Sequence, residues 1–404
     1  MNILVLNAGS SSQKSALYQL TSELPIAAPE PIWSANIDWT VQTGKGILKA
    51  KTSQIEQKTT LETNDKSKAI ALMLDTLVTG ETAVITKLSQ IDLVGHRVVH
   101  GGAEYDRSTK ITPEVKEAIA RLIPLAPAHN PAHLEGIEAI ENILGTVPQI
   151  AVFDTGFHRN LPPEAAIYPI PYQWYERGIR RYGFHGISHQ YCSDRAAQIL
   201  NIPKKSSRII VCHLGNGCSL SAVKNGVSID TTMGFTPLEG LMMGTRSGSI
   251  DPAILIYLMR EHGFDAASLD TMLNKESGLK GVSGVSADVR EINKAIASGN
   301  KRARLALDIY IQRLKKAIGA MLPLLGGLDI LVFTAGIGEN SSVIRAETCK
   351  AFEFMGLKLD LIQNDNNITE QNIALPDSQV KIIVIHTNED WAIARESWQY
   401  YEKN

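Results

Sequence analysis

The chain has 404 residues, of which 44% are hydrophobic and 20% charged, and its formal net charge is −2. This length and composition suffice for two domains or one large one, and the charge gives no reason to expect nucleic acid or an anionic membrane as partner. Four cysteines without a CxxC pair argue against a zinc site and a disulfide framework and fit a reduced cytoplasm. The N-terminus does not read as a signal peptide, and the one long apolar region, 317–333, is interrupted by Pro323, Gly326, Gly327 and Asp329, so we expect no membrane span.

The first twenty residues predict a strand, a tight turn and a second strand. An apolar run over 3–6 ends at Asn7, the small residues 8–12 (AGSSS) form the turn, and polar and apolar residues then alternate. Such a turn offers backbone N–H groups and hydroxyls to a phosphate, and Lys14 lies just beyond it. The spacing is not that of a Walker A loop, and a serine-rich turn by itself is more often only a turn.

The rest of the first half reads as alternating strands and helices. We expect strands at 33–39, 46–51, 91–100 and 149–153, and helices at 66–78, 112–125 and 132–144. Arg97 lies inside an otherwise apolar strand, Asp154 directly follows another, and His129 lies in a proline-flanked loop.

Near residue 155 the character changes to a proline-rich connection, followed at 180–189 by a polar and aromatic segment that opens a helix. From residue 207 the opening pattern returns as a strand, a glycine-containing turn at 214–217 and a second strand. We interpret this as a structural repeat of the first hairpin, which predicts two similar domains facing one another across a cleft. The second half then has helices at 252–262, 287–297 and 301–325, strands at 330–334 and 381–386, and a final helix to residue 401.

Three glycine-containing turns, at 8–12, 214–217 and 335–338, follow apolar strands. Each alone is a weak signal, but together they favour a cleft that cradles phosphates and a nucleoside. The segment GIGENS (336–341) lacks the third glycine of a dinucleotide fingerprint, which argues against NAD.

Two arginines are candidates for anion binding. Arg246 lies in a loop of small residues, 243–249, where nothing forms a core, so an anion explains it better than packing does. Arg97 is about as consistent with a structural ion pair as with a ligand clamp.

Asn7, Asp154 and Glu389 follow apolar strands, where a carboxylate is either a helix cap or directed at the cleft. Together these oxygen donors suit Mg²⁺. His185 and His189 are four residues apart, but no third ligand has zinc spacing, so we interpret His129 and His185 as donors to developing negative charge.

Nine ordered blocks resemble the acetokinase family along the whole chain. They are NAGSSSQK (7–14), GHRVVHGG (95–102), APAHNP (126–131), FDTGFH (153–158), RRYGFHGISH (180–189), HLGNGCS (213–219), GFTPLEGLMMGTRSGSIDP (234–252), FTAGIGENS (333–341) and HTNED (386–390). The resemblance implies an α/β fold with two duplicated actin-like ATPase (ribonuclease H-like) domains flanking a nucleotide cleft, as in sugar kinases, Hsp70 and actin. It places the N-terminal domain at 1–155 plus 386–404 and the nucleotide-binding domain at 156–385.

The resemblance also implies reversible, direct in-line phosphoryl transfer from ATP to acetate with Mg²⁺, which Mn²⁺ could replace. It further implies a cytoplasmic homodimer without nucleic-acid or membrane partners. It assigns catalysis to Arg97, Asp154, His185 and Arg246, and the metal to Asn7 and Glu389. Substrate binding falls to Arg97, Val99, Ala128, His129, Phe184 and Pro237. ATP or ADP binding falls to Ser12, Lys14, His213, Gly215, Asn216, Gly217, Asp288, Val289, Arg290, Gly336, Ile337, Gly338 and Asn340.

Two alternatives stay open at this point. The family usually has leucine where this chain has Ala128, and the smaller side chain leaves room for propionate, so a propionate kinase is the first alternative. The second is a nucleotide-gated binding protein in the manner of Hsp70 or actin, which would leave Arg97 and Arg246 without a task.

Overall fold

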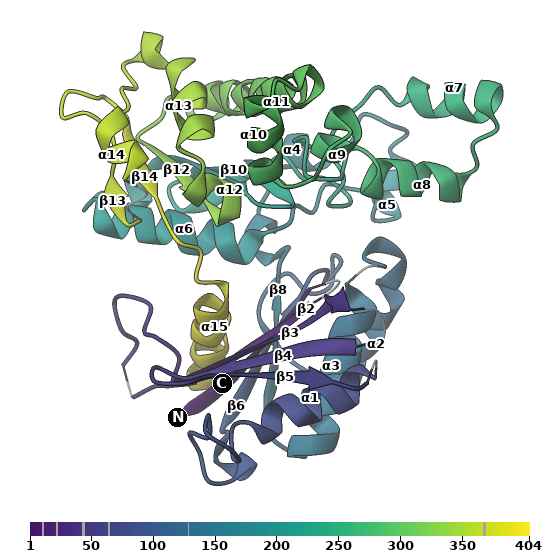
Figure 1. The fold of residues 1–404 in the computed structure, drawn as a ribbon, viewed down its shortest axis with the longest axis vertical. Coiled ribbons are helices and arrows are strands. Elements are labelled where there is room, and N and C mark those ends of the chain that lie inside the picture. The colour runs from purple at the N-terminus through teal and green to yellow at the C-terminus, as the bar shows by residue number, and fades with distance from the viewer. Residues whose placement is uncertain (10–11, 22, 43–44, 64, 128, 367–368) are drawn as a thin grey trace. The chain divides into compact units, whose positions relative to one another are not determined.

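The computed structural model describes residues 1–404 except 10–11, 22, 43–44, 64, 128 and 367–368 (Figure 1). The chain forms two compact units: unit 1 comprises Met1–Gly156 and Asn388–Asn404, and unit 2 comprises Phe157–Thr387. The domain limits expected from the sequence lie close to these boundaries, and a separate function for each domain stays a prediction.

Unit 1 contains an eight-stranded sheet in the order β5-β4-β3-β2-β1-β6-β8-β7. Strands β1 to β5 form an antiparallel meander, β1, β6 and β8 run parallel, and β7 is an antiparallel edge strand. The strands are β1 (Asn2–Ala8), β2 (Ser12–Gln19), β3 (Trp33–Gln42), β4 (Lys45–Lys51), β5 (Glu56–Leu61), β6 (Leu93–Val98), β7 (Thr109–Lys110) and β8 (Gln149–Phe153). The helices are α1 (Lys66–Asp75), α2 (Pro113–Arg121), α3 (Asn130–Leu144) and α15 (Glu389–Lys403), the last formed by the returning C-terminus.

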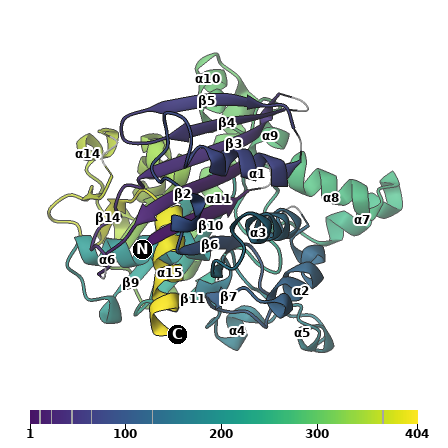
Figure 2. The same ribbon diagram turned by 90° about the horizontal axis from the view of Figure 1, so that it is seen from below.

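Helices cover both faces of this sheet because the central strands are apolar on both sides. Leu17 packs into the core beneath α1 and α3, whereas its neighbour Tyr18 contacts Trp391 of α15 with ring centroids 5.5 Å apart. Side chains alternate along a strand, so α15 lies on the face opposite α1 and α3 (Figure 2). At Gly95 a Cβ would come within 2.4 Å of Ser397 Oγ, so the close approach of α15 to β6 requires glycine there.

Unit 2 contains a six-stranded sheet in the order β11-β10-β9-β12-β14-β13. Its strands are β9 (Arg208–Leu214), β10 (Cys218–Lys224), β11 (Val227–Thr231), β12 (Ile330–Thr334), β13 (Gln371–Asn372) and β14 (Lys381–Val384). The helices are α4 (Pro163–Ala166), α5 (Gln173–Glu176), α6 (Gly186–Ile199), α7 (Ala253–His262), α8 (Ala266–Lys275), α9 (Gly278–Ser283), α10 (Val289–Ala297), α11 (Lys301–Leu325), α12 (Ala335–Asn340), α13 (Ser342–Lys350) and α14 (Leu361–Asp365).

The two sheets confirm the predicted repeat. In each, an antiparallel hairpin (β1–β2 or β9–β10) leads into a parallel trio (β1-β6-β8 or β9-β12-β14), which an antiparallel edge strand completes. In unit 2, Cys218 faces Tyr310 of α11, while the next residue, Ser219, faces α6, so these helices cover opposite faces.

Several elements differ from the sequence expectations, and among those not predicted are helices α4, α5 and α14 and the two-residue strands β7 and β13. Strand β5 was not predicted because its sequence, EQKTTL, buries only Leu61 and shows no apolar alternation. Helices α8 and α9 were not predicted either. The expected glycine turn at 335–338 is wrong, because Ala335 adopts a left-handed conformation (φ 64°) that reverses the chain in one residue and α12 starts at once.

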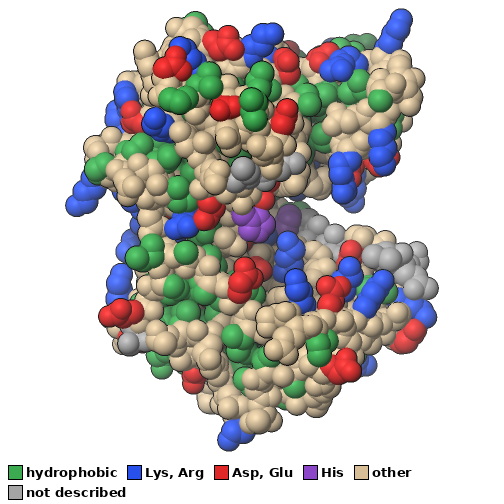
Figure 3. Space-filling model, turned by 60° about the vertical axis from the view of Figure 1, so that its left-hand side comes forward, with side chains coloured by type: hydrophobic (Ala, Val, Ile, Leu, Met, Phe, Trp, Pro, Cys, Tyr) green, Lys and Arg blue, Asp and Glu red, His purple; other side chains and the backbone are tan. Residues whose placement is uncertain are grey.

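Charged side chains of both signs are interspersed on the face drawn in Figure 3, as the small net charge leads one to expect. Among the described residues, no helix is long and apolar enough to cross a bilayer.

Candidate functional site

A cavity of about 630 Å³ lies in unit 2, within the size range of small-molecule sites. Residues expected to contact the nucleotide line it: Gly215, Asn216, Asp288, Val289, Arg290, Gly336, Ile337 and Asn340. Ala287, Asn293 and Ser341 also line it and were not predicted. Gly338, which was predicted, does not line the cavity; it packs inside α12 against β9.

The cavity walls are fixed by local hydrogen bonds. Asp288 caps α10 by accepting from Arg290 N at 2.8 Å and also holds the exposed Arg290 guanidinium, with Nη2 2.6 Å from Oδ2. Gly215 N donates to Gly217 O at 3.0 Å, which closes the turn between β9 and β10. Gly244 packs so tightly on this turn that a Cβ would lie 2.4 Å from Asn216 Oδ1.

Arg246 points its guanidinium at the same turn. Its Nη1 donates to Pro237 O at 3.1 Å and would lie 3.5 Å from a Cβ placed on Gly217. No described carboxylate lies within ion-pair distance of it. Burial lowers the pKa of Arg246 below its ordinary value, yet an arginine stays charged at neutral pH. The site therefore holds a partly buried cation that lacks a counter-ion among the described residues.

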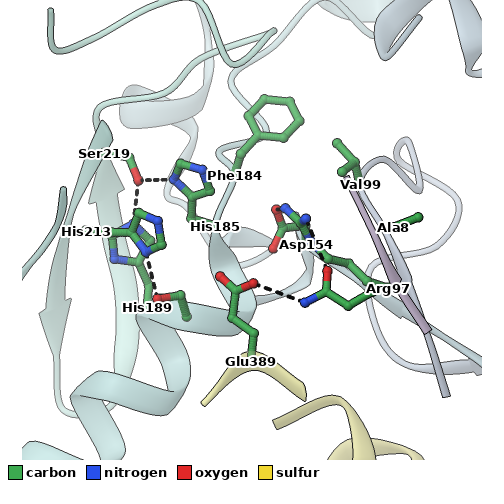
Figure 4. Close-up of polar contacts among 12 residues, drawn as sticks. Ala8, Arg97, Val99, Asp154, Phe184, His185, His189, His213, Ser219 and Glu389 are labelled. Atoms are coloured by element: carbon green, nitrogen blue, oxygen red, sulfur yellow. Dashed lines mark hydrogen bonds and ion pairs between the residues drawn. The ribbon is translucent and has the colours of Figure 1, made fainter. Parts of the chain in front are cut away.

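His185 lies beside Arg246 at this turn. A Cβ on Gly217 would be 3.3 Å from His185 Cε1 and 3.4 Å from Nε2. His185 precedes α6 in a left-handed conformation (φ 58°), which is unusual for a residue other than glycine and is typical of functional sites. Its Nδ1 is 2.9 Å from Ser219 Oγ, and its ring stacks on His213 with centroids 4.1 Å apart (Figure 4).

Of the other predicted residues in unit 2, His213 is buried rather than open to the cavity. Its Nδ1 lies 2.8 Å from Ser188 Oγ. Phe184 is also buried, and its carbonyl oxygen lies 3.2 Å from His158 Nε2.

In unit 1, Arg97 and Asp154 form an ion pair, with Arg97 Nη2 2.8 Å from Asp154 Oδ2 (Figure 4). Their side chains are only 14% and 2% exposed. Burial alone would lower the pKa of Arg97, but the charges of Asp154, Glu389 and Asp390 raise it well above its ordinary value. The residue is thus a structural ion-pair member, and a ligand role for it stays a prediction.

The residues expected to hold the metal, Asn7 and Glu389, meet in unit 1. Asn7 Nδ2 donates to Glu389 Oε2 at 3.4 Å and to Asp390 Oδ1 at 2.9 Å. Burial raises the pKa of Asp390. The charges of Asp154, Glu389 and Asp390 all act on Arg97, and carboxylate and amide oxygens are the ligands that a hard cation prefers. The described part of the chain has no cluster of three His, Cys, Asp or Glu that could cage a metal. Mg²⁺ is usually held by one or two carboxylates plus phosphates and water, so the donor set suits it.

The remaining predicted residues of unit 1 are Val99, His129, Ser12, Lys14 and Ala128. Ala128 lies outside the described residues. Val99 is buried, and its N–H donates to His133 Nδ1 at 3.3 Å. His129 precedes α3, with its ring 6.5 Å from that of His133. Ser12 is half-buried and Lys14 exposed, the latter paired with Asn7 across β1 and β2.

Sequence reasoning missed His133 and Asp390. His133 Nε2 lies 3.1 Å from Ala8 O, so this ring joins α3 to β1 and β6, and burial lowers its pKa to about 3. Its position one helical turn after His129 was the available signal. For Asp390 the signal was its place beside Glu389.

A sequence profile described as the Acetokinase family matches residues 2–395. A relative from Rippkaea orientalis named acetate kinase is 63% identical over 404 residues, covering 100% of both chains. Among solved structures, an acetate kinase from Porphyromonas gingivalis superimposes with a TM-score of 0.90 and 42% identity, covering 99% of each chain. A propionate kinase from Francisella tularensis superimposes with a TM-score of 0.89 and 40% identity, covering 98% of this chain and 99% of the other.

Proposed function

The chain belongs to the acetokinase family, which has the actin-like ATPase fold, and on this basis we propose that it catalyses reversible transfer of the ATP γ-phosphoryl group to acetate. One acetate oxygen forms the bond to the γ-phosphorus while the bond to the β,γ-bridging oxygen breaks, giving acetyl phosphate and ADP. No proton has to be removed from the nucleophile, because a carboxylate is already ionised at neutral pH. The protein's task is therefore to position two anions and to neutralise their charge.

The observation that carries this proposal is the charge of Arg246. A partly buried guanidinium without a described carboxylate partner is poorly stabilised unless an anion joins it. Its neighbours are the Gly215–Gly217 turn and the nucleotide-sized cavity, so the anion that fits is a nucleotide phosphate. We assign Arg246 to the transferring phosphoryl group, where its planar fork matches the phosphoryl oxygens.

His185, beside Arg246 at this turn, acts on the same charge. An imidazole N–H aimed at the phosphoryl oxygens stabilises the charge that develops on them during transfer. Gly215, Asn216 and Gly217 bring backbone N–H groups close to the phosphates, and the cavity beyond them receives the nucleoside.

In unit 1, we assign Arg97 to the acetate carboxylate, with Asp154 orienting its guanidinium. The Arg97 side chain keeps 14% of its surface exposed, through which a carboxylate could reach it. Asn7 and Glu389 would hold Mg²⁺, which when bound supplies positive charge to the phosphate oxygens. We further assign Val99 and His129 to binding of the acid, and Ser12 and Lys14 to binding of the nucleotide phosphates.

The preferred acid is the main alternative within this reaction class. Similarity to a propionate kinase and the alanine at position 128 both favour testing a longer acid. An added methylene changes discrimination by only about 1–3 kcal/mol in an apolar pocket, so acetate and propionate are expected to differ in rate rather than absolutely.

The test is to trap the acyl phosphate with hydroxylamine in reactions of the purified protein with ATP, Mg²⁺ and a panel of short-chain acids. We expect hydroxamate and ADP in equal amounts, with the highest kcat/KM for acetate. A higher kcat/KM for propionate would make the protein a propionate kinase. Nucleotide binding without acid-dependent ADP release would favour the non-enzymatic alternative instead. We further propose that the protein acts in the cytoplasm as a homodimer.

A further inference from the structure

A single serine hydroxyl in unit 2 bridges two histidine rings (Figure 4). Ser219 Oγ lies 2.9 Å from His185 Nδ1 and 2.7 Å from His189 Nε2. Ser219 and His189 are both fully buried, on β10 and α6 respectively.

The shared hydroxyl couples the protonation of the two rings. A serine hydroxyl has one proton, so it can donate to only one nitrogen and must accept from the other. When both imidazoles are neutral, one ring therefore presents an N–H to Ser219 and the other a lone pair. The tautomer of His185 is thus tied to that of His189.

The surroundings of His185 indicate which of its two neutral tautomers can assist phosphoryl transfer. Its Nε2 faces the Gly217 turn beside Arg246, where a Cβ on Gly217 would be 3.4 Å from Nε2 and 3.5 Å from Arg246 Nη1. An anionic oxygen bound there needs a hydrogen-bond donor, whereas a bare ring nitrogen would repel it. The proton of His185 must then lie on Nε2, and Nδ1 must accept.

The His213 ring, which stacks on His185, also contacts a serine. Thr387 Oγ1 donates to Ser188 Oγ at 2.9 Å, and Ser188 Oγ lies 2.8 Å from His213 Nδ1. This contact helps to hold the His213 ring in place against His185.

We propose that Ser219 is a positioning residue that accepts from His189 Nε2–H and donates to His185 Nδ1, thereby holding the His185 proton on Nε2, toward the phosphoryl group. The left-handed backbone conformation of His185 sets the direction in which its side chain leaves the backbone, and Ser219 sets which ring nitrogen carries the proton. The choice of Nε2 rests on the proposed function, because it follows from an anion bound at the Gly217 turn, whereas the tautomer itself can be measured without substrate.

The direct test is two-bond ¹H–¹⁵N correlation NMR of the ¹⁵N-labelled full chain without nucleotide, with His185→Gln identifying the His185 signals. We expect a neutral His185 ring with its proton on Nε2 in the unaltered protein. In Ser219→Ala we expect a mixture of tautomers or a move of the proton to Nδ1. A proton on Nδ1, or on both nitrogens, in the unaltered protein would overturn the inference, whatever the enzyme's substrate.

Kinetics supply the second readout. Ser219→Ala should lower kcat roughly ten- to hundredfold, the scale of a weakened transition-state donor, while the KM for ATP changes by less than about twofold. Ser219→Thr, which keeps the hydroxyl, should recover most of the loss. The matched control is Ser221→Ala, because Ser221 is equally buried on the same strand and bonds Ser228 at 3.1 Å instead of His185. A kcat for Ser219→Ala within about twofold of the parent would contradict the proposal. Absence of any acetate-dependent turnover in the parent would refute the proposed function, and the NMR result would still decide the tautomer.

Discussion

Replacing Arg246 with alanine should separate activity from stability. The side chain has one described hydrogen bond that anchors its guanidinium to a backbone oxygen, from Nη1 to Pro237 O, and no described carboxylate partner. Losing that bond costs about 1 kcal/mol, which is offset by removing a charge that burial disfavours. We therefore expect the free energy of unfolding to change by no more than about 1 kcal/mol.

The same substitution should remove roughly 10³-fold or more from kcat, as loss of an arginine that stabilises a transferring phosphoryl group does elsewhere. That factor corresponds to about 4 kcal/mol of transition-state stabilisation. The assays are hydroxamate formation and urea unfolding, run in parallel. Arg313→Ala is the matched control, since Arg313 Nη1 also donates to one carbonyl, that of Ser249 at 3.1 Å, away from the Gly217 turn. A kcat within tenfold of the parent, or a loss of several kcal/mol in unfolding, would refute the reasoning.

Three further outcomes are expected. Arg97→Met should lose about 3–5 kcal/mol of unfolding free energy in urea, because it removes the ion-pair partner of the Asp154 carboxylate, which is only 2% exposed, and adding Asp154→Asn should recover most of the loss. A loss under about 1 kcal/mol would contradict a stabilising role of this buried ion pair. Gly217→Ala places a methyl group 3.3 Å from His185 Cε1 and should lower kcat/KM roughly tenfold without changing the melting temperature. An unchanged kcat/KM would contradict the proposal that the phosphoryl group binds at the Gly215–Gly217 turn. The free energy of unfolding should fall as pH drops below 6.5, because burial lowers the pKa values of His96, His100 and His133 in the folded chain to about 4, 4 and 3, so the unfolded chain binds their protons first. The expected loss at pH 5 is on the order of 2 kcal/mol for each histidine. An unfolding free energy that stays constant between pH 7 and pH 5 would contradict this prediction.

The repeat of the fold could be predicted because each hairpin combines alternating strands with a turn of small residues, a pattern that is local in sequence. The anion-binding role of Arg246 could also be predicted from the sequence, because its small neighbours in the loop 243–249 cannot form a core around its side chain. Strand β5 could not be predicted, because an edge strand with one buried residue has no apolar signal.

The hydrogen-bond partners in the site were beyond sequence reasoning. Ser219 meets His185 and His189 only because α6 packs across β9 and β12, next to the start of β10, and no spacing along the chain encodes that contact. The left-handed conformations of His185 and Ala335 were likewise hidden, because neither residue type favours them.

The central claim is that Arg246 binds the phosphoryl group most strongly during transfer, and affinity for a transition-state mimic tests it most directly. Isothermal titration of the parent and Arg246→Ala with ADP, Mg²⁺, acetate and a planar metal fluoride compares that affinity with the affinity for ADP alone. We predict that Arg246→Ala weakens binding of the mimic roughly 10³-fold while ADP affinity changes by less than about threefold. Equal affinities of the two proteins for the mimic would contradict the account.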